Sequence, residues 1–170
     1  TDINVGDTFT YTLVSGSGDT DNASFNISSN SLRITASPDF ETKSSYTVRI
    51  KTTDQGGLSF EKAFTITVTN VNETPTALAL STTSVAENAS SGTAVGALST
   101  TDVDSGDAFT YTLVSGTGST NNASFAISGA NLVTAAVFDF ETKSIYALRV
   151  RTTDAGGLTF DREVTITVTN

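Results

Sequence analysis

The sequence contains no cysteine, no histidine and no tryptophan, and the first two absences argue against whole classes of function. Without cysteine the chain has no disulfide and no thiol nucleophile, so a secreted protein of this composition needs another source of rigidity. Without histidine the many serines lack their usual activating partner, and a zinc or copper site lacks its common ligands. No apolar run approaches the ~20 residues of a transmembrane helix. We therefore expect no enzyme, and no membrane contact in this segment.

Positive charge is also scarce. Nine Lys and Arg residues stand against eighteen Asp and Glu residues, for a net charge of −9. This balance disfavours nucleic acid and anionic membranes as partners and favours cations. Hydrophobic residues make up 37% of the chain and charged residues only 16%, whereas Ser, Thr, Asn and Gly are abundant. The composition is typical of a globular, β-rich protein.

An internal repeat organises the chain. When residues 1–70 are aligned with residues 101–170 without a gap, 43 of the 70 positions are identical. The period is therefore 100 residues, which fits two small domains. We assign residues 1–70 to a repeat that lacks its first strands and residues 71–170 to a complete repeat. The linker between them is residues 70–75, Asn-Val-Asn-Glu-Thr-Pro.

The complete repeat shows the alternation of half-buried strands. Residues 108–114 alternate large apolar side chains with threonine, and residues 164–169 do the same at the end of the chain. In residues 145–152 both arginines share one parity, which we expect to face water. Turn-forming clusters separate these runs, and no segment has a helical period. The pattern predicts an all-β fold: tandem Greek-key, seven-stranded β-sandwich domains of the immunoglobulin-like kind with antiparallel strands.

The first repeat has the same alternation but no counterpart of residues 71–100. As written, one edge of its sandwich is open, with apolar side chains and backbone groups unpaired. Two explanations stay open: the sequence begins inside the repeat, or a strand from another chain adds to the open edge.

Carboxylates gather at the predicted ends of strands. Asp102 and Asp104 precede one strand, Asp139 and Glu141 precede another, and Asp154 begins a Gly-Gly turn. Side chains two positions apart in an extended segment point to the same side, so each pair can offer oxygens to one ion. Sets of hard oxygen ligands are what Ca²⁺ binds. The alternative for any single residue is a solvated turn position, and periodicity does not decide which loops face each other.

These motifs together resemble the tandem cadherin-like repeats of extracellular and bacterial surface proteins, along the whole chain. The resemblance lies in Ala86-Glu87-Asn88, Asp102-Val103-Asp104, Asp139-Phe140-Glu141, Asp154 and linker residues 70–74. It implies that Ca²⁺ binds at the joint between the repeats. The implied ligands are Asp39, Glu41, Asn70, Asn72, Glu73, Asp102, Asp104 and Asp154, with Asp107 a weaker candidate nearby.

The same resemblance implies two half-sites. Glu87, Asp139 and Glu141 would serve a joint after Asn170. The other half-site, for a joint before Thr1, consists of Asp2, Asn4, Asp7 and Asp54.

The predicted function is structural. We expect a calcium-rigidified spacer of an extracellular adhesin or matrix filament at the cell surface. Its partners are neighbouring repeats of the same protein and, through strand donation, other copies. The alternative is a carbohydrate- or protein-binding module of a secreted surface protein, although sugar platforms usually expose Trp or Tyr and this chain has no Trp.

Overall fold

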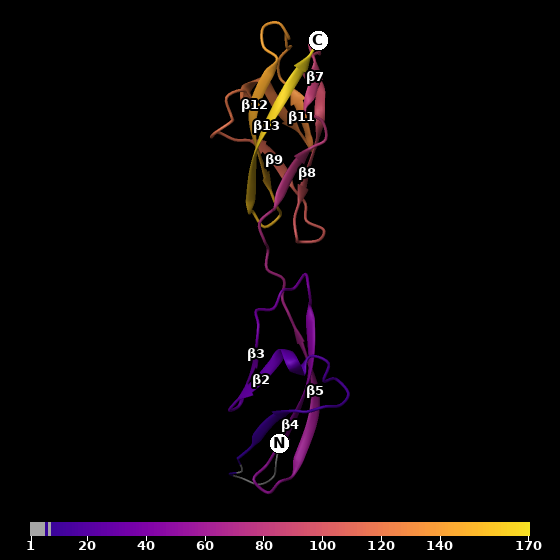
Figure 1. The fold of residues 1–170 in the computed structure, drawn as a ribbon, viewed down its shortest axis with the longest axis vertical. Helices are drawn as coiled ribbons and strands as arrows, with labels where there is room; N and C mark the ends of the chain where they lie inside the picture. The colour runs from indigo at the N-terminus through magenta and orange to yellow at the C-terminus, as the bar shows by residue number, and fades with distance from the viewer. Residues whose placement is uncertain (1–5, 7) are drawn as a thin grey trace. The chain divides into compact units, whose positions relative to one another are not determined.

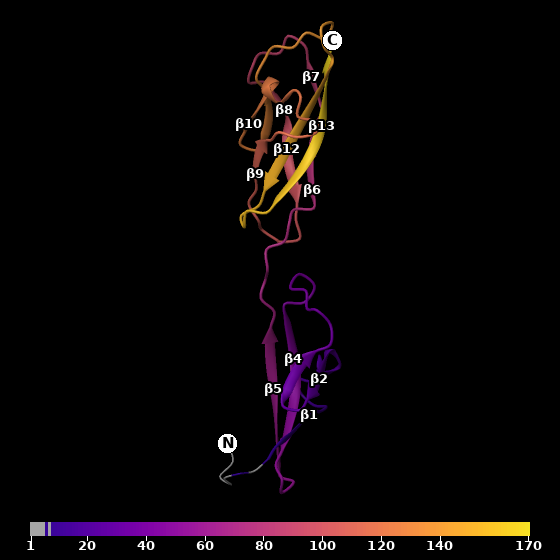
Figure 2. The same ribbon diagram turned by 90° about the vertical axis from the view of Figure 1, so that its left-hand side faces the viewer.

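The computed structural model describes residue 6 and residues 8–170. The chain forms two compact units, unit 1 (Thr1–Val71) and unit 2 (Asn72–Asn170). Each unit is built from β-strands, with one 3₁₀ turn in each, η1 (Asn22–Ser24) and η2 (Asn122–Ser124) (Figures 1 and 2). Within the described residues, no helix has the length and apolar character that crossing a membrane requires.

Unit 2 is a sandwich of two sheets with eight strand segments. They are β6 (Ala77–Leu80), β7 (Ser84–Ala86), β8 (Ala94–Thr101), β9 (Thr110–Leu113), β10 (Phe125–Ser128), β11 (Asn131–Thr134), β12 (Ile145–Thr153) and β13 (Thr159–Thr169). One sheet has the order β10-β11-β8-β6 and the other β7-β13-β12-β9. Because the first strand is divided between the sheets as β6 and β7, this is the predicted seven-stranded sandwich.

The core of unit 2 follows the predicted alternation. Along β12, Tyr146, Leu148 and Val150 are buried, and their neighbours in the chain are more exposed. The rings of Phe125 and Phe138 pack on Tyr146, with centroids 5.9 and 4.7 Å from it. Each fully buried side chain of this size contributes about 1.5–3 kcal/mol to folding. The inward row of each long strand therefore holds the two sheets together.

Segment β7 departs from the prediction that all strands are antiparallel. It pairs in parallel with the end of β13, with Val85 opposite Val168. Val85 is buried, and its two neighbours in β7 are exposed. A three-residue strand with one inward side chain is too short for its alternation to be recognised, and this explains why the sequence pattern missed it.

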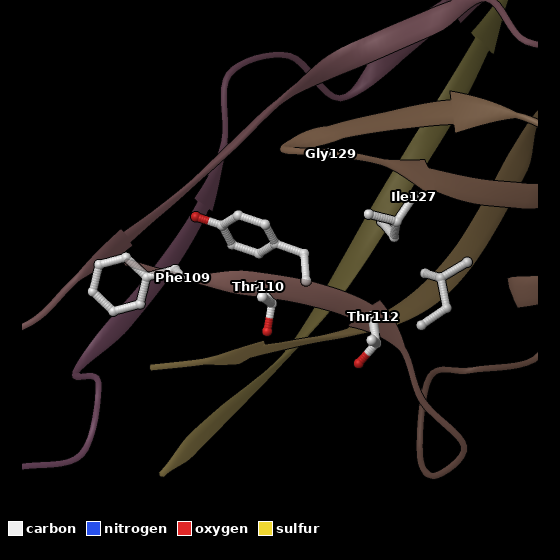
Figure 3. A pocket seen from close by; sticks show the side chains of 7 residues that line it. Phe109, Thr110, Thr112, Ile127 and Gly129 are labelled. Carbon is white, nitrogen blue, oxygen red and sulfur yellow. The ribbon is translucent and has the colours of Figure 1, made fainter. Parts of the chain in front are cut away.

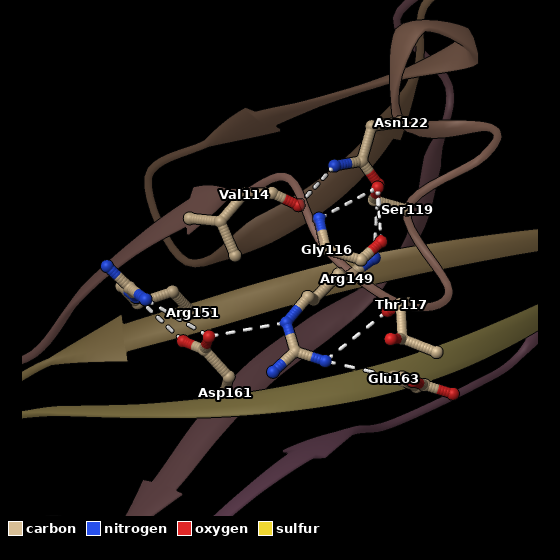
Figure 4. Close-up of polar contacts among 9 residues, drawn as sticks. All are labelled: Val114, Gly116, Thr117, Ser119, Asn122, Arg149, Arg151, Asp161 and Glu163. Atoms are coloured by element: carbon tan, nitrogen blue, oxygen red, sulfur yellow. Dashed lines mark hydrogen bonds and ion pairs between the residues drawn. The ribbon is translucent and has the colours of Figure 1, made fainter.

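The outer face of β12 holds the connection from β9 to β10 (Figure 4). Asn122 Nδ2 donates to the Val114 carbonyl at 2.9 Å, and Asn122 Oδ1 accepts from the Arg149 N–H at 3.0 Å. The Arg149 side chain donates to the Thr117 carbonyl at 3.3 Å and to Asp161 at 3.3 Å. Both arginines of β12 lie on this polar face, as predicted.

Unit 1 has five strands among its described residues. They are β1 (Thr10–Leu13), β2 (Phe25–Ser28), β3 (Ser31–Ile34), β4 (Ser45–Thr53) and β5 (Ser59–Thr67). β1, β4 and β5 form one sheet, and β2 and β3 form another. They match β9 to β13 at an offset of 100 residues. Within residues 6 and 8–71 nothing corresponds to β6, β7 or β8, so the inner face of unit 1 is open.

Candidate metal site

Acidic residues gather at the end of unit 2 where the chain enters it. Three segments meet at this linker end: residues 72–75, the connection from β8 to β9, and the turn from β12 to β13 (Figure 1). The carboxylates of Asp102, Asp107 and Asp154 offer oxygens that all lie within 4.8 Å of one another. Oδ2 of Asp102 and Oδ2 of Asp107 are buried and have no hydrogen-bond partner. The fold therefore places two unpartnered carboxylate oxygens where water does not reach them.

Asp104 ties this loop to the linker. It is only 7% exposed, and its Oδ2 accepts a hydrogen bond from the Glu73 N–H at 2.8 Å. Its own N–H donates to Asp102 Oδ1 at 3.2 Å, which bends the loop around the first aspartate. The carboxylates of Glu73 and Asp104 also approach within 4.8 Å. The Asp-x-Asp pair thus lies beside the linker, as the sequence predicted.

Asp154 is fixed by the turn that it begins. Its Oδ1 accepts from the Leu158 N–H at 2.8 Å, and its Oδ2 accepts from Asn72 Nδ2 at 3.0 Å. Gly156 leaves room for that contact, because a Cβ there would lie 2.4 Å from Asn72 Cγ. The turn and the linker are therefore fitted to each other beside the cluster.

The cluster fits a calcium ion in its donor chemistry. Two unit charges about 5 Å apart repel by roughly 3 kcal/mol at an effective dielectric constant of about 20, and three carboxylates make three such pairs. All the side-chain donors are carboxylate or amide oxygens, the ligands that Ca²⁺ prefers. The unpartnered oxygens of Asp102 and Asp107 are the positions where a cation would replace missing hydrogen bonds.

A second acidic group lies at the opposite end of unit 2, near the C-terminus (Figure 1). Carboxylate oxygens of Glu87, Asp139 and Glu141 lie within 4.8 Å of one another. Asp139 accepts from the Thr142 N–H at 3.0 Å and from Thr142 Oγ1 at 2.9 Å. These bonds hold the pKa of Asp139 below its usual value, so it stays ionised. The three carboxylates that the sequence analysis assigned to a half-site therefore lie together.

Unit 1 repeats this loop. Asp39 accepts from the Thr42 N–H at 3.1 Å and from Thr42 Oγ1 at 3.0 Å, and these two bonds lower its pKa as well. Glu41 is exposed two residues further on in the same loop, and Asn70 lies close to the end of the unit.

Part of the other predicted half-site is outside the described structure. Asp2, Asn4 and Asp7 lie outside the described residues. Asp54 accepts from the Leu58 N–H at 2.8 Å, as Asp154 does from Leu158.

Comparison with known protein families identifies the repeats. The family model of the cadherin domain matches residues 81–169, which is more than half of the chain. The chain belongs to the cadherin domain family. The predicted resemblance is therefore confirmed, and the acidic clusters of unit 2 are typical of the Ca²⁺ sites of cadherins.

Protocadherin Fat 4 is similar to both cadherin repeats. The mouse protein is 30% identical over 164 residues and the human protein 32% identical over 162 residues. Each match covers 90% of this chain but only 3% of the relative. The chain therefore spans a small part of the length of the curated relatives that it matches.

Solved structures of protocadherins have the same fold. The protocadherin GammaB4 extracellular domain is 27% identical, with a TM-score of 0.68 over 94% of this chain and 26% of that chain. Human Protocadherin-24 EC1-2 is 18% identical, with a TM-score of 0.73 over 95% of this chain and 81% of that chain, which shows the shared fold alone. The two repeats are extracellular domains of an adhesion-related, non-enzymatic family.

The predicted ligands that belong to unit 2 lie close together, and one weaker candidate lies among them. Asn72, Glu73, Asp102, Asp104 and Asp154 all lie at the linker end, as described above. Asp107, predicted only as a weaker candidate, lies inside the acidic cluster with a buried oxygen. Its signal in the sequence is its position next to Gly106, whose φ of +93° turns the loop back.

Unit 2 also has a hollow of about 510 Å³ away from the acids, beside β9 and the turn after β10 (Figure 3). Phe109, Ile127 and Gly129 are among its lining residues. Thr110 and Thr112 direct their hydroxyls to the side of β9 away from Ile127. The lining contains no carboxylate, and the hydroxyl of Tyr111 accepts a hydrogen bond from Thr100 Oγ1 at 3.1 Å. The hollow is therefore an apolar gap between two sheet edges.

Proposed function

We propose that this chain is a structural spacer of an extracellular adhesion protein, made rigid by Ca²⁺ bound where its two cadherin repeats join. The observation that carries the proposal is the cluster of Asp102, Asp107 and Asp154, in which two buried oxygens have no hydrogen-bond partner. Leaving a buried polar atom without a partner costs roughly 1–3 kcal/mol, and a bound cation would supply that partner.

The proposed ligands supply only oxygen atoms. They are Asp39, Glu41, Asn70, Asn72, Glu73, Asp102, Asp104 and Asp154, with Asp107 added from the geometry of unit 2. The bound ion supplies positive charge that offsets the repulsion among the carboxylates. The chain's own part is to position them: the Glu73 N–H holds Asp104, and the Leu158 N–H holds Asp154.

The expected affinity is that of an extracellular module. Such sites bind Ca²⁺ with dissociation constants of roughly 10⁻⁴–10⁻³ M. An ion held at this strength is bound outside cells and released by chelators. The expected behaviour is therefore a stiff pair of repeats in calcium and a hinged pair without it.

Small-angle X-ray scattering tests the proposal. The chain is measured in millimolar Ca²⁺ and in excess chelator, at several protein concentrations. A stiff particle that becomes flexible on chelation supports the spacer. Identical scattering in both conditions contradicts it, and a matched experiment with Mg²⁺ separates a calcium effect from charge screening.

We propose partners for this chain only in general terms. Neighbouring cadherin repeats are the first partners of each unit, because the chain itself is a tandem array. A carbohydrate- or protein-binding module is the alternative function, and lack of a calcium response would favour it.

A further inference from the structure

Three hydroxyl groups meet inside unit 2, between its two sheets. Thr152 on β12 is fully buried, and its Oγ1 lies 2.7 Å from Oγ1 of Thr100 on β8, in the facing sheet. Thr100 Oγ1 also donates to the Tyr111 hydroxyl on β9 at 3.1 Å. Because Thr100 gives its single hydroxyl proton to Tyr111, the Thr152 hydroxyl is the donor of the bond to Thr100. The three groups form one directed hydrogen-bonded set, the hydroxyl network.

The hydroxyl of Thr152 stands in an otherwise apolar and aromatic row. It continues the inward side of β12, on which Tyr146, Leu148 and Val150 are buried. Valine is similar in shape to threonine and can be buried without a hydrogen-bond partner, whereas a buried hydroxyl needs one. Packing of the two sheets alone therefore does not require this hydroxyl.

Each hydroxyl of the network lies on a segment that carries one carboxylate of the acidic cluster at the linker end. In the sequence the pairs are Thr100 and Asp102, Tyr111 and Asp107, and Thr152 and Asp154. The three carboxylates have oxygens within 4.8 Å of one another. The network therefore joins, inside the sandwich, the same three segments whose ends form the cluster.

The bond between Thr100 and Thr152 sets how closely the two sheets approach at this end. The two oxygens lie 2.7 Å apart, whereas two carbon atoms in contact lie about 3.5–4.0 Å apart. Methyl groups in place of the two hydroxyls would therefore separate β8 and β12 by roughly 1 Å. Ca²⁺ holds its oxygen ligands at about 2.3–2.6 Å, so a shift of this size takes a carboxylate out of reach.

We propose that the Thr100–Thr152 bond, oriented by the Tyr111 hydroxyl, sets the spacing of the clustered carboxylates for a calcium ion. The inference rests on the proposed function, because it concerns the same ion site. None of the three hydroxyls is a ligand. They are positioning residues, and each acts through the segment on which a carboxylate lies.

The test compares whole chains by isothermal titration calorimetry with Ca²⁺. Every chain, including the reference, carries Glu141→Gln, which weakens the acidic group at the opposite end of unit 2. Thr152→Val should raise the calcium dissociation constant about tenfold, as for the loss of a group that positions a metal ligand. Thr152→Ser keeps the hydroxyl and should stay within about twofold of the reference.

A double variant separates spacing from stability. In Thr100→Val with Thr152→Val, neither hydroxyl of the bonded pair is left without its partner, so the melting temperature in chelator should recover much of what Thr152→Val alone loses. The two methyl groups still hold the strands apart. The calcium dissociation constant should therefore stay about tenfold or more above that of the reference.

Thr134 on β11 provides a matched control. It is 1% exposed, and its hydroxyl donates to the Ser90 carbonyl at 2.9 Å and accepts from the Thr93 N–H at 3.1 Å. Thr93 precedes Thr100 by seven residues, which is about 20 Å along an extended chain. Thr134→Val thus removes buried hydrogen bonds far from the cluster, and it should leave the calcium dissociation constant within about twofold of the reference.

Terbium luminescence reports on the site geometry itself. Tb³⁺ takes the same kind of hard oxygen ligands as Ca²⁺, and its decay rates in H₂O and D₂O count the water molecules bound to it. Thr152→Val should add about one water to the bound ion, because a carboxylate that has moved away leaves a coordination position open. Thr134→Val should add none.

The outcomes distinguish this inference from the proposed function. If the reference chain binds no Ca²⁺ at about millimolar concentration, the proposed function fails and the positioning role fails with it. If the reference binds and Thr152→Val binds equally well, both being folded by circular dichroism, the positioning role alone is wrong. Recovery of both affinity and melting temperature in the double variant would also contradict it, because the hydroxyls would then serve stability only.

Discussion

The backbone N–H of Glu73 donates to Asp104 Oδ2 at 2.8 Å, so the segment that leads into the second cadherin repeat is tied directly to the Asp-x-Asp loop. This bond links a residue near the start of the unit to a loop 31 positions further along the chain. Any ion that binds Asp104 therefore also acts on the linker. The relationship explains why mechanical stiffness and calcium binding are expected to change together.

Removing the Asp-x-Asp pair should abolish the response to calcium. In the double variant Asp102→Ala, Asp104→Ala the melting temperature should no longer rise on addition of Ca²⁺, because both carboxylates of the loop are lost. Differential scanning calorimetry with and without Ca²⁺ measures this. Glu163→Ala is the control, since it removes an exposed acid on the outer sheet face and should keep the rise. An unchanged rise in the double variant would place the calcium site elsewhere.

Filling the space at Gly156 should weaken calcium binding without unfolding the chain. A Cβ there would lie 2.4 Å from Asn72 Cγ, so Gly156→Ala forces Asn72 away from Asp154. We expect the calcium dissociation constant, measured by isothermal titration calorimetry, to rise about three- to tenfold, as for the loss of one neutral ligand. Gly56→Ala is the matched control, because a Cβ there meets only Asp54 Oδ1, at 3.4 Å. Equal effects of the two changes would show that Asn72 has no part in binding.

Asn122 should be important for the stability of unit 2. Its side chain bonds both the Val114 carbonyl and the Arg149 N–H, and Asn122→Ala leaves both without that partner. The free energy of unfolding should fall by about 2–3 kcal/mol, measured by urea denaturation with NMR signals from unit 2. Thr112→Ala, an exposed change on β9, should stay within about 0.5 kcal/mol.

Unit 1 should lose stability in acid through Asp21. The Lys43 ammonium and the Thr47 N–H, which donates at 2.7 Å, hold the pKa of Asp21 below its ordinary value. A lowered folded-state pKa means that the contribution is complete above the ordinary value of 3.8 and is lost as the pH falls through the folded-state pKa. Asp21→Asn, which copies Asn121 of unit 2, should therefore flatten the acid side of the stability profile. The check is thermal unfolding between pH 2 and 7, and an identical profile in the variant would exclude this role.

The sequence by itself determined the fold class, the repeat and most of the acidic residues of the linker end. These features are local or periodic: threonine alternates with Phe109, Tyr111 and Leu113, and acids sit two apart in short loops. The 100-residue offset then transfers each assignment from one repeat to the other. Strand alternation and turn chemistry act over a few residues, so they can be read without knowing the fold.

Only the tertiary structure decided which residues meet and which stay exposed. Asp107 enters the cluster because the loop folds back at Gly106, and the parallel pairing of β7 depends on the far end of the chain. Val164 on β13 is only 7% exposed. Burial depends on what packs against a residue, and in unit 2 the covering strands come from a segment at least 63 positions away from Val164, which alternation along one strand cannot reveal.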